Sequence, residues 1–234
     1  VLARVIKDFI MSNTPCLLLS PTQAELTGIL SHLGKGVLEG TSTNVCGFGA
    51  IAAAARTSLL IARHQPEVVL LAGIAGSLDP QCIVGDAYRF HCVRSYGIGV
   101  GDGQLFQSAE QIGWKHLQEN GDDILQSIGD VIRGSDESSE LDSHSVITKE
   151  LLSVCAASSS EADVKLKQKS CPEAVAEDME GFAVAAACIM NNVRWIIVRG
   201  ISNHAGDRTH SNWQIEKALK NTSEYIERIL AHKQ

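Results

Sequence analysis

The strongest constraint on the fold is a short, nearly unbroken run of apolar residues at positions 67–72 (EVVLLA). Apolar side chains at consecutive positions are typical of a strand that is covered on both faces, as in a parallel sheet with helices on either side. A comparable run lies at Cys16–Ser20 (CLLLS), and another lies at 195–201 (WIIVRGI). The sequence therefore has to supply helices for both faces of one sheet.

Helical stretches alternate with the apolar runs along nearly the whole chain. Further strand candidates are two short pieces within 36–46, then 86–93, 151–157 and a strand from Val175, and the predicted helices are 23–33, 50–63, 161–169, 180–190 and 213–231. This alternation predicts an α/β fold, a three-layer sandwich around a central mixed, largely parallel, twisted sheet. Residues 16–234 are expected to form a single domain without an internal repeat, and residues 1–15 an N-terminal extension. Two interpretations of residues 1–10 stay open, a short amphipathic helix or a segment upstream of a true start at Met11.

Composition excludes several classes of protein. At 44% hydrophobic and 20% charged residues, the 234-residue chain has the composition of a folded domain. A pI near 5.6 without a basic stripe argues against nucleic acid as the main partner. The longest apolar run, residues 182–190, is far shorter than the roughly 20 residues of a membrane span. Seven scattered cysteines without a Cys-x-x-Cys pair are typical of reduced thiols in a cytosolic protein.

The net charge of −7 is concentrated in one segment. Residues 110–142 hold nine acidic and two basic residues, so the rest of the chain is balanced. We expect this segment to be a solvated helix and loop that favours solubility, and its most polar part, residues 134–145, to be a surface loop.

Some motifs suggest cofactor chemistry but carry little weight. Residues 47–52 (GFGAIA) fit a dinucleotide-binding turn, with Glu67 at a suitable distance for a ribose contact, but a tight strand-to-helix turn is the favoured interpretation. The alternating glycines of residues 97–103 lack the Lys-Ser/Thr of a phosphate loop and are expected to rim a pocket. The eight histidines, including His204 and His210, show no metal-binding spacing, and no cofactor or metal is predicted.

Polar or glycine-rich clusters follow the predicted strands, where ligand sites of open α/β sheets lie. Glu25 follows the first strand, and Gly73-Ile74-Ala75-Gly76-Ser77 follows EVVLLA as an expected glycine turn. Glu180 begins a predicted helix within AEDMEG, and Ser202-Asn203 follow WIIVRGI. Each cluster alone has a structural explanation, such as a solvated carboxylate or a helix N-terminus, but their order along the chain is harder to attribute to chance.

Together these residues resemble the nucleoside phosphorylase and nucleosidase superfamily. The resemblance rests on VVLLAGIAGSLDP with the later Gly85-Asp86 pair, on AEDMEGFAVAAAC and on VRGISNHAGDR, and it spans residue 16 to about residue 229. It implies cleavage of N-ribosidic bonds of small purine nucleosides, by a protein that is commonly a homodimer or higher homo-oligomer.

Three details narrow the resemblance. A glutamate after the first strand positions water in the hydrolases of this group, and Glu25 fits that spacing. Leu71 stands where phosphorylases commonly carry a phosphate-holding arginine. Asn203 stands where adenine-releasing nucleosidases carry aspartate, and its amide suits a hypoxanthine-type base because it offers both a donor and an acceptor.

Within the superfamily, the segments around 158–181 and 201–208 together with Trp213 look most like the futalosine hydrolases. These enzymes release hypoxanthine from futalosine in a menaquinone pathway. Ala157-Ser158-Ser159 replace the usual glycine-containing turn, and Cys155 also departs from the pattern.

The resemblance assigns roles to the candidate residues. Glu180 is expected to accept hydrogen bonds from the ribose hydroxyls and to favour the developing cation, with Met179 packed against the sugar. Glu25 is the candidate general base for water, and Asn203 is expected to hold the purine through N7 and O6.

Further candidate residues are expected around the base and around the far end of the substrate. The backbone of Gly73, Ile74, Ala75 and Gly76 is expected to line the pocket, with Ser202 beside the base. Arg208 is the first candidate for the carboxyphenyl group of futalosine and Arg94 the second, although a surface ion pair is an equally good explanation for either arginine.

Four alternative functions remain open. They are a purine nucleoside phosphorylase, a methylthioadenosine or adenosylhomocysteine nucleosidase, a dinucleotide-dependent oxidoreductase and a non-catalytic nucleoside sensor.

Overall fold

The computed structural model describes residues 16–118, 126–134 and 146–231. The expected N-terminal extension and nearly all of the expected surface loop at 134–145 lie outside these residues.

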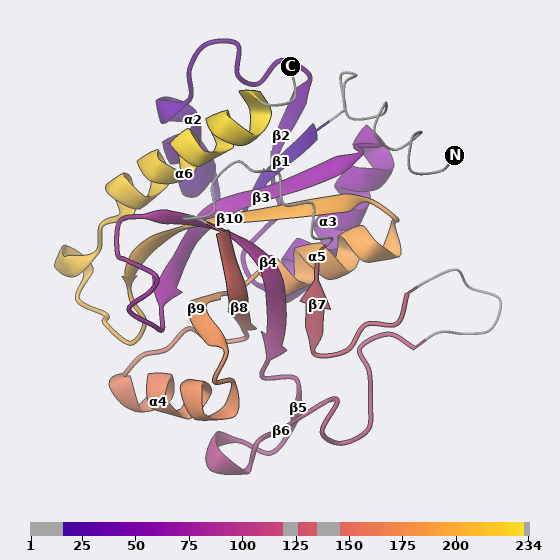
Figure 1. Cartoon of the computed structure of the whole chain (residues 1–234). Coiled ribbons are helices and arrows are strands. Elements are labelled where there is room, and N and C mark those ends of the chain that lie inside the picture. The colour runs from indigo at the N-terminus through magenta and orange to yellow at the C-terminus, as the bar shows by residue number, and fades with distance from the viewer. Residues whose placement is uncertain (1–15, 119–125, 135–145, 232–234) are drawn as a thin grey trace.

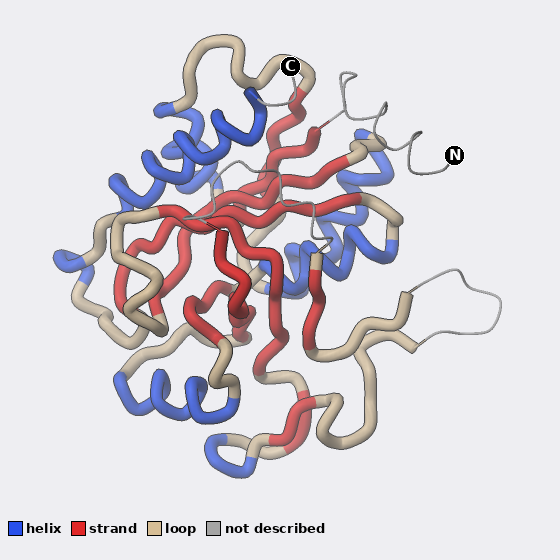
Figure 2. The backbone as a smooth tube through the Cα atoms, in the orientation of Figure 1, coloured by secondary structure: helices blue, strands red, loops and turns tan. Residues whose placement is uncertain are grey.

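One eight-stranded sheet forms the centre of the described chain, as Figures 1 and 2 show. Its strands follow the order β10-β4-β8-β9-β3-β1-β2, with β7 paired to β4. Most neighbours are parallel, while β4 runs antiparallel to β10 and β7, and β9 to β3. The bounds are β1 (Cys16–Ser20), β2 (Thr41–Val45), β3 (Val68–Ser77), β4 (Ala87–Tyr96), β7 (Val131–Arg133), β8 (Val146–Val154), β9 (Ala174–Asp178) and β10 (Arg194–His204).

The sheet partly closes on itself. Because β10 also pairs with β3, the five strands β10, β4, β8, β9 and β3 form a hydrogen-bonded ring, from which β1 and β2 extend. A small hairpin of β5 (Gly99–Val100) and β6 (Gln107–Ser108) stands apart from this sheet. The alternation of elements predicted the mixed, mostly parallel sheet but not the closure.

Helices cover the sheet on opposite sides, which confirms the predicted sandwich (Figure 1). α2 (Gln23–His32) and α6 (Ile215–Ala231) pack over β1, β3 and β10, and α3 (Ala50–His64) and α5 (Gly181–Met190) cover the other face. α4 (Glu161–Ser170) lies beside β8 and β9. None of the helices in the described ranges is both long and apolar enough to cross a membrane.

The structure corrects the predicted boundaries at three places. Residues 36–46 contain one strand rather than two, because residues 35–40 form turns in which Gly36 and Gly40 adopt positive φ angles of 84° and 72°. The expected glycine turn after EVVLLA is instead strand, since β3 continues through Gly73 and Gly76 to Ser77. β10 likewise continues through Ser202 and Asn203.

The acidic segment differs from the expected solvated helix. Its described parts, 110–118 and 126–134, contain turns, an isolated bridge and β7 but no helix. Asp130 is buried, and its carboxylate lies 3.3 Å from Nε2 of His116, whose ring packs against Phe182. At least one acid of this segment therefore belongs to the interior.

Close packing of α6 on β10 requires a glycine at position 200. A Cβ on Gly200 would lie 2.4 Å from the carbonyl oxygen of Ala218 and 2.6 Å from Oγ1 of Thr222. We therefore expect Gly200→Ala to reduce the free energy of unfolding by about 2 kcal/mol, because backbone must move to admit the methyl group. The matched control is Gly34→Ala, whose Cβ would meet the flexible carboxylate of Glu227 at 3.1 Å. Urea unfolding followed by circular dichroism measures both, and equal losses would contradict this packing argument.

Candidate active site

One cavity of about 460 Å³ collects nearly all of the predicted site residues. It lies beside the carboxyl ends of β3, β9 and β10 and the start of α2. Apart from Gly73, every candidate lines it, namely Glu25, Ile74, Ala75, Gly76, Met179, Glu180, Ser202, Asn203 and Arg208. The residues predicted from the sequence therefore lie together on one cavity, although they make up less than half of its lining.

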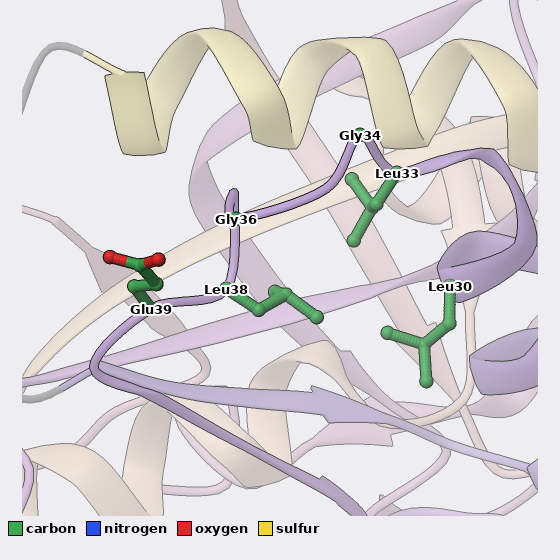
Figure 3. A pocket seen from close by; sticks show the side chains of 6 residues that line it. All are labelled: Leu30, Leu33, Gly34, Gly36, Leu38 and Glu39. Atoms are coloured by element: carbon green, nitrogen blue, oxygen red, sulfur yellow. The ribbon is translucent and has the colours of Figure 1, made fainter.

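Two further cavities are less suited to chemistry. One of about 440 Å³ lies below α6, and Figure 3 shows leucine side chains in it with Glu39 as the single charged residue. Another of about 550 Å³ is lined by Gly97, Gly101 and Gly103, as expected for the glycine-rich segment, and shares Ala157 with the candidate site. Neither of these two cavities is lined by the buried carboxylates of the candidate site.

A buried arginine that the sequence analysis missed lies behind the candidate site. Arg199 is completely buried in β10, and its Nε and Nη2 lie 3.0 and 2.6 Å from Oδ2 of Asp178. Nη2 also lies 3.3 Å from Oε2 of Glu180. Burial alone would lower the pKa of Arg199, but the charges of Asp178, Glu180 and Glu25 outweigh it and raise that pKa. Because Arg199 sits inside the apolar run WIIVRGI, its local sequence indicated only a strand.

Asp178 joins this arginine to the start of α5. Its Oδ2 also accepts the Gly181 N–H at 2.8 Å, and its Oδ1 accepts the Ser153 hydroxyl at 2.6 Å. The Ser153 hydroxyl oxygen in turn accepts the Phe182 N–H at 2.7 Å. These bonds satisfy amides at the helix N-terminus and fix the backbone on which Glu180 stands.

Glu180 is the N-cap residue of α5 and points toward the turn that follows β2. Its Oε1 accepts the N–H of Gly49 at 2.9 Å, and Gly47 and Gly49 adopt positive φ angles of 98° and 81° in that turn. The GFGAIA segment is thus a tight strand-to-helix turn, as favoured above. Burial raises the pKa of Glu180 to about 7, with the Arg199 charge opposing the rise and the Asp178 charge adding to it.

Glu25 enters the cavity from the first turn of α2. Thr22 caps this helix, accepting the Glu25 N–H at 3.2 Å and donating its hydroxyl to Oε2 of Glu25 at 2.6 Å. Oε1 of Glu25 accepts the N–H of Ile74 at 3.0 Å. The carboxylate is therefore oriented by a side chain of its own helix and by the backbone of β3.

Position 73, inside β3, requires a glycine. A Cβ there would lie 2.4 Å from Nη1 of Arg199 and 2.6 Å from Oε1 of Glu25. Nη1 of Arg199 is buried and has no hydrogen-bond partner among the described residues. Gly73 thus lies behind the site rather than on its wall, and its missing side chain lets the two charged groups approach each other.

The direction of the Asn203 side chain follows from an irregularity in β10. The register with β3 shifts between Ile201 and Asn203, so that Asn203 pairs with Gly76. Oδ1 of Asn203 accepts the Ser202 hydroxyl at 2.7 Å, and its Nδ2 donates to the carbonyl oxygen of His204 at 2.8 Å. An amide has two donors and two acceptor lone pairs, so one of each remains for a ligand.

Of the two arginines considered for the far end of a substrate, only Arg208 lines the cavity. It lies over the ring of Trp213 at 5.1 Å, and His210 stacks on the same ring with centroids 4.6 Å apart. Arg94 lies elsewhere on β4 in a two-pronged ion pair with Glu150, which raises the pKa of Arg94. Arg94 is therefore held in an ion pair, but with a buried partner rather than in the surface ion pair that the sequence suggested. No group of three or more His, Cys, Asp or Glu suited to a metal ion occurs within the described ranges.

Known proteins resemble this chain in both sequence and fold. A family model described as the phosphorylase superfamily matches residues 36–232. A 5′-methylthioadenosine/S-adenosylhomocysteine nucleosidase of Staphylococcus aureus is 25% identical over 195 residues, covering 79% of this chain and 78% of that protein.

Two solved structures share the fold at low sequence identity. A nucleosidase of the same name from Colwellia psychrerythraea, in complex with adenine, has a TM-score of 0.73 at 21% identity and covers 95% of this chain and 96% of its own. A futalosine hydrolase of Helicobacter pylori has a TM-score of 0.70 at 18% identity and covers 92% and 97%.

The raised pKa of Glu180 predicts a pH dependence of stability. Between the ordinary value of 4.5 and about 7, the folded protein keeps a proton on Glu180 that the unfolded chain has released. The free energy of unfolding should therefore fall by up to about 3 kcal/mol from this group as pH rises through that window. Urea unfolding at pH 5, 6, 7 and 8 measures the slope. Glu180→Gln should flatten it and the exposed control Glu39→Gln should not, so equal slopes in all three proteins would contradict the assignment.

Proposed function

The chain belongs to the phosphorylase superfamily, and from this membership we propose that it hydrolyses the N-ribosidic bond of a 6-oxopurine nucleoside. Futalosine is the first candidate substrate, and hypoxanthine would be released in menaquinone biosynthesis. The observation that carries the proposal is the convergence of two buried carboxylates, Glu25 and Glu180, and the amide of Asn203 on one cavity.

Glu180 and Met179 are suited to the sugar. Glu180 in its ionised form can accept hydrogen bonds from the ribose 2′- and 3′-hydroxyls, and its charge stabilises the cation that develops as the N-ribosidic bond breaks. Met179, adjacent in the chain and also on the cavity wall, supplies an apolar contact to the ring. Arg199 behind Glu180 holds this carboxylate in place.

Glu25 is suited to activating water at the anomeric carbon. Its two oxygens are oriented by Thr22 and Ile74, and the lone pairs that these bonds leave can hold and deprotonate a water molecule in the cavity. A phosphate dianion in the same place would meet three carboxylates, of Glu25, Asp178 and Glu180, against one buried guanidinium. This balance of charge favours water over phosphate, as does Leu71, which is fully buried in the core.

Asn203 is suited to a 6-oxopurine. Its remaining N–H can donate to O6, and its remaining lone pair can accept from N7 once the departing base is protonated there. The backbone of Ile74, Ala75 and Gly76 and the Ser202 hydroxyl border the same part of the cavity. For futalosine, Arg208 at the cavity rim is the candidate partner of the carboxyphenyl group.

The substrate is tested by incubating the protein with futalosine, inosine and methylthioadenosine, each with and without phosphate, and identifying the released base by chromatography. Hypoxanthine release from futalosine without phosphate is expected. Adenine release from methylthioadenosine alone would favour the activity named for the S. aureus and C. psychrerythraea proteins, and strict dependence on phosphate would favour a phosphorylase. Tight nucleoside binding without base release would favour a sensor.

The role of Glu25 is tested by Glu25→Gln. The amide keeps the size of the side chain but is a poor base, so kcat should fall by about 1,000-fold while the melting temperature changes little. Glu224→Gln on the exposed face of α6 is the matched control and should retain full turnover. A Glu25→Gln variant with a kcat within tenfold of the wild type would remove Glu25 from the mechanism.

A further inference from the structure

A short stretch of chain separates the candidate site from the neighbouring cavity of about 550 Å³. Of these two cavities, Ala157 lines both, Ala156 lines the neighbouring one and Ser158 lines the candidate site. We call residues 156–158 the partition. The partition follows the end of β8 and belongs to no helix or strand. Because a cavity lies on either side of it, packing against other side chains contributes little to holding the partition in place.

A buried ion pair lies across the partition. Lys167 lines the neighbouring cavity from α4, the helix beside β8 and β9 in Figure 1, and Glu177 lines the candidate site from β9. The two residues are 6% and 5% exposed, and Nζ of Lys167 lies 2.7 Å from Oε2 of Glu177. A buried ion pair is costly unless further hydrogen bonds satisfy both partners, so its other contacts decide what the pair contributes.

The other side-chain hydrogen bonds of this pair go to the partition. Nζ of Lys167 donates to the carbonyl oxygen of Ala156 at 2.9 Å and to Oγ of Ser158 at 3.0 Å. Glu177 accepts the Ser158 N–H at 2.7 Å through Oε1 and the Ser158 hydroxyl at 2.8 Å through Oε2. With the bond to Glu177, the three donors of the ammonium group are used. The partition is thus tied to α4 and to β9 at the same time.

The side chain of Ser158 completes this cluster. Ser158 is 2% exposed, and its hydroxyl accepts from Lys167 while it donates to Glu177. A glycine at this position could offer only its backbone to the pair. The presence of Ala157-Ser158-Ser159 in place of a glycine-containing turn therefore adds two contacts to the cluster.

The two catalytic candidates are held by separate contacts. Glu25 is oriented by Thr22 and by the backbone of β3, and Glu180 by Arg199 and by the turn after β2. None of these contacts involves Lys167 or the partition. A displaced partition would therefore change the shape of the cavity and leave the reacting groups where they are.

We propose that Lys167 is a positioning residue that holds the partition in place through Glu177 and Ser158 and thereby sets how tightly the candidate site binds its nucleoside. The inference rests on the proposed function in one respect, that the ligand of the site is a nucleoside. It assigns to a residue outside the candidate site a role in substrate affinity and not in cleavage of the N-ribosidic bond.

Steady-state kinetics of Lys167→Met test this role. With the nucleoside that the wild type cleaves, KM should rise about tenfold, because contacts worth a charged hydrogen bond no longer hold the wall, while kcat stays within about threefold. A variant that is merely less stable would lose active protein, which lowers the apparent kcat and leaves KM unchanged. An unchanged KM in folded Lys167→Met would overturn the proposal.

Two further variants serve as rescue and control. Lys167→Arg keeps a cation with several donors and should recover part of the wild-type KM. Lys165→Met, on the exposed face of α4, removes a lysine of the same helix and should leave KM and kcat unchanged. The same rise of KM in Lys165→Met as in Lys167→Met would overturn the proposal.

A double variant covers the case in which Lys167→Met does not fold. The single substitution leaves the charge of Glu177 buried without its cation, which is strongly destabilising. Lys167→Met/Glu177→Leu removes both charges at similar volume, a change that is often neutral for stability. The double variant should fold and still show the raised KM, and a wild-type KM in it would overturn the proposal.

Amide hydrogen exchange measures the partition without requiring turnover. Peptides that cover residues 155–160 should exchange about tenfold faster in Lys167→Met or in the double variant than in the wild type, because local opening becomes easier. Peptides from β8 and α2 should exchange at the wild-type rate. Equal exchange of residues 155–160 in the wild type and a folded variant would overturn the proposal.

The two proposals fail in different ways. A wild-type protein that cleaves no nucleoside would contradict the proposed function, and the exchange of residues 155–160 would still decide whether Lys167 holds the partition. Cleavage of futalosine by the wild type together with an unchanged KM in folded Lys167→Met would support the function and overturn the role of Lys167.

Discussion

The buried guanidinium of Arg199 is the interaction on which the arrangement of the site depends. A cation with no solvent exposure is tolerated only where carboxylates and hydrogen bonds compensate for lost hydration, and Asp178 and Glu180 supply them. Since Asp178 ends β9 and Glu180 begins α5, the same contacts join β10 to the junction of β9 and α5 across β3. Ring closure and the positioning of the site therefore share one ion cluster.

This cluster does not cancel its own charge. Arg199 serves two carboxylates directly, and Glu25 is near enough to raise the Arg199 pKa as well. Burial consequently dominates at Glu180 and raises its pKa to about 7, in spite of the neighbouring guanidinium. The excess negative charge lowers the free energy of unfolding, but it suits a site that must attract a developing cation. The function of the site therefore reduces the stability of the fold.

The sequence predicted what depends on short-range pattern. The alternation of apolar runs and helical stretches predicted the sheet, and the ends of those runs, together with the family resemblance, singled out Glu25, Glu180 and Asn203, which line one cavity. The interpretation of Gly73 and Gly76 as turn residues was wrong, because both lie within β3, and at Gly73 the need for glycine comes from Arg199 and Glu25, side chains from distant elements. Local sequence propensity does not reveal that strands far apart in the sequence lie close together in space.

The charged residues missed by the sequence analysis have a common physical reason. Arg199 lies inside an apolar run and Lys167 on an otherwise polar helix, so the first pattern predicted only a strand and the second only a helix. Their burial depends on which carboxylates the sheet register brings beside them, Asp178 for Arg199 and Glu177 for Lys167. Strand order and register are therefore the information that sequence pattern lacked, and the groups that tune such a site are those whose partners come from another strand.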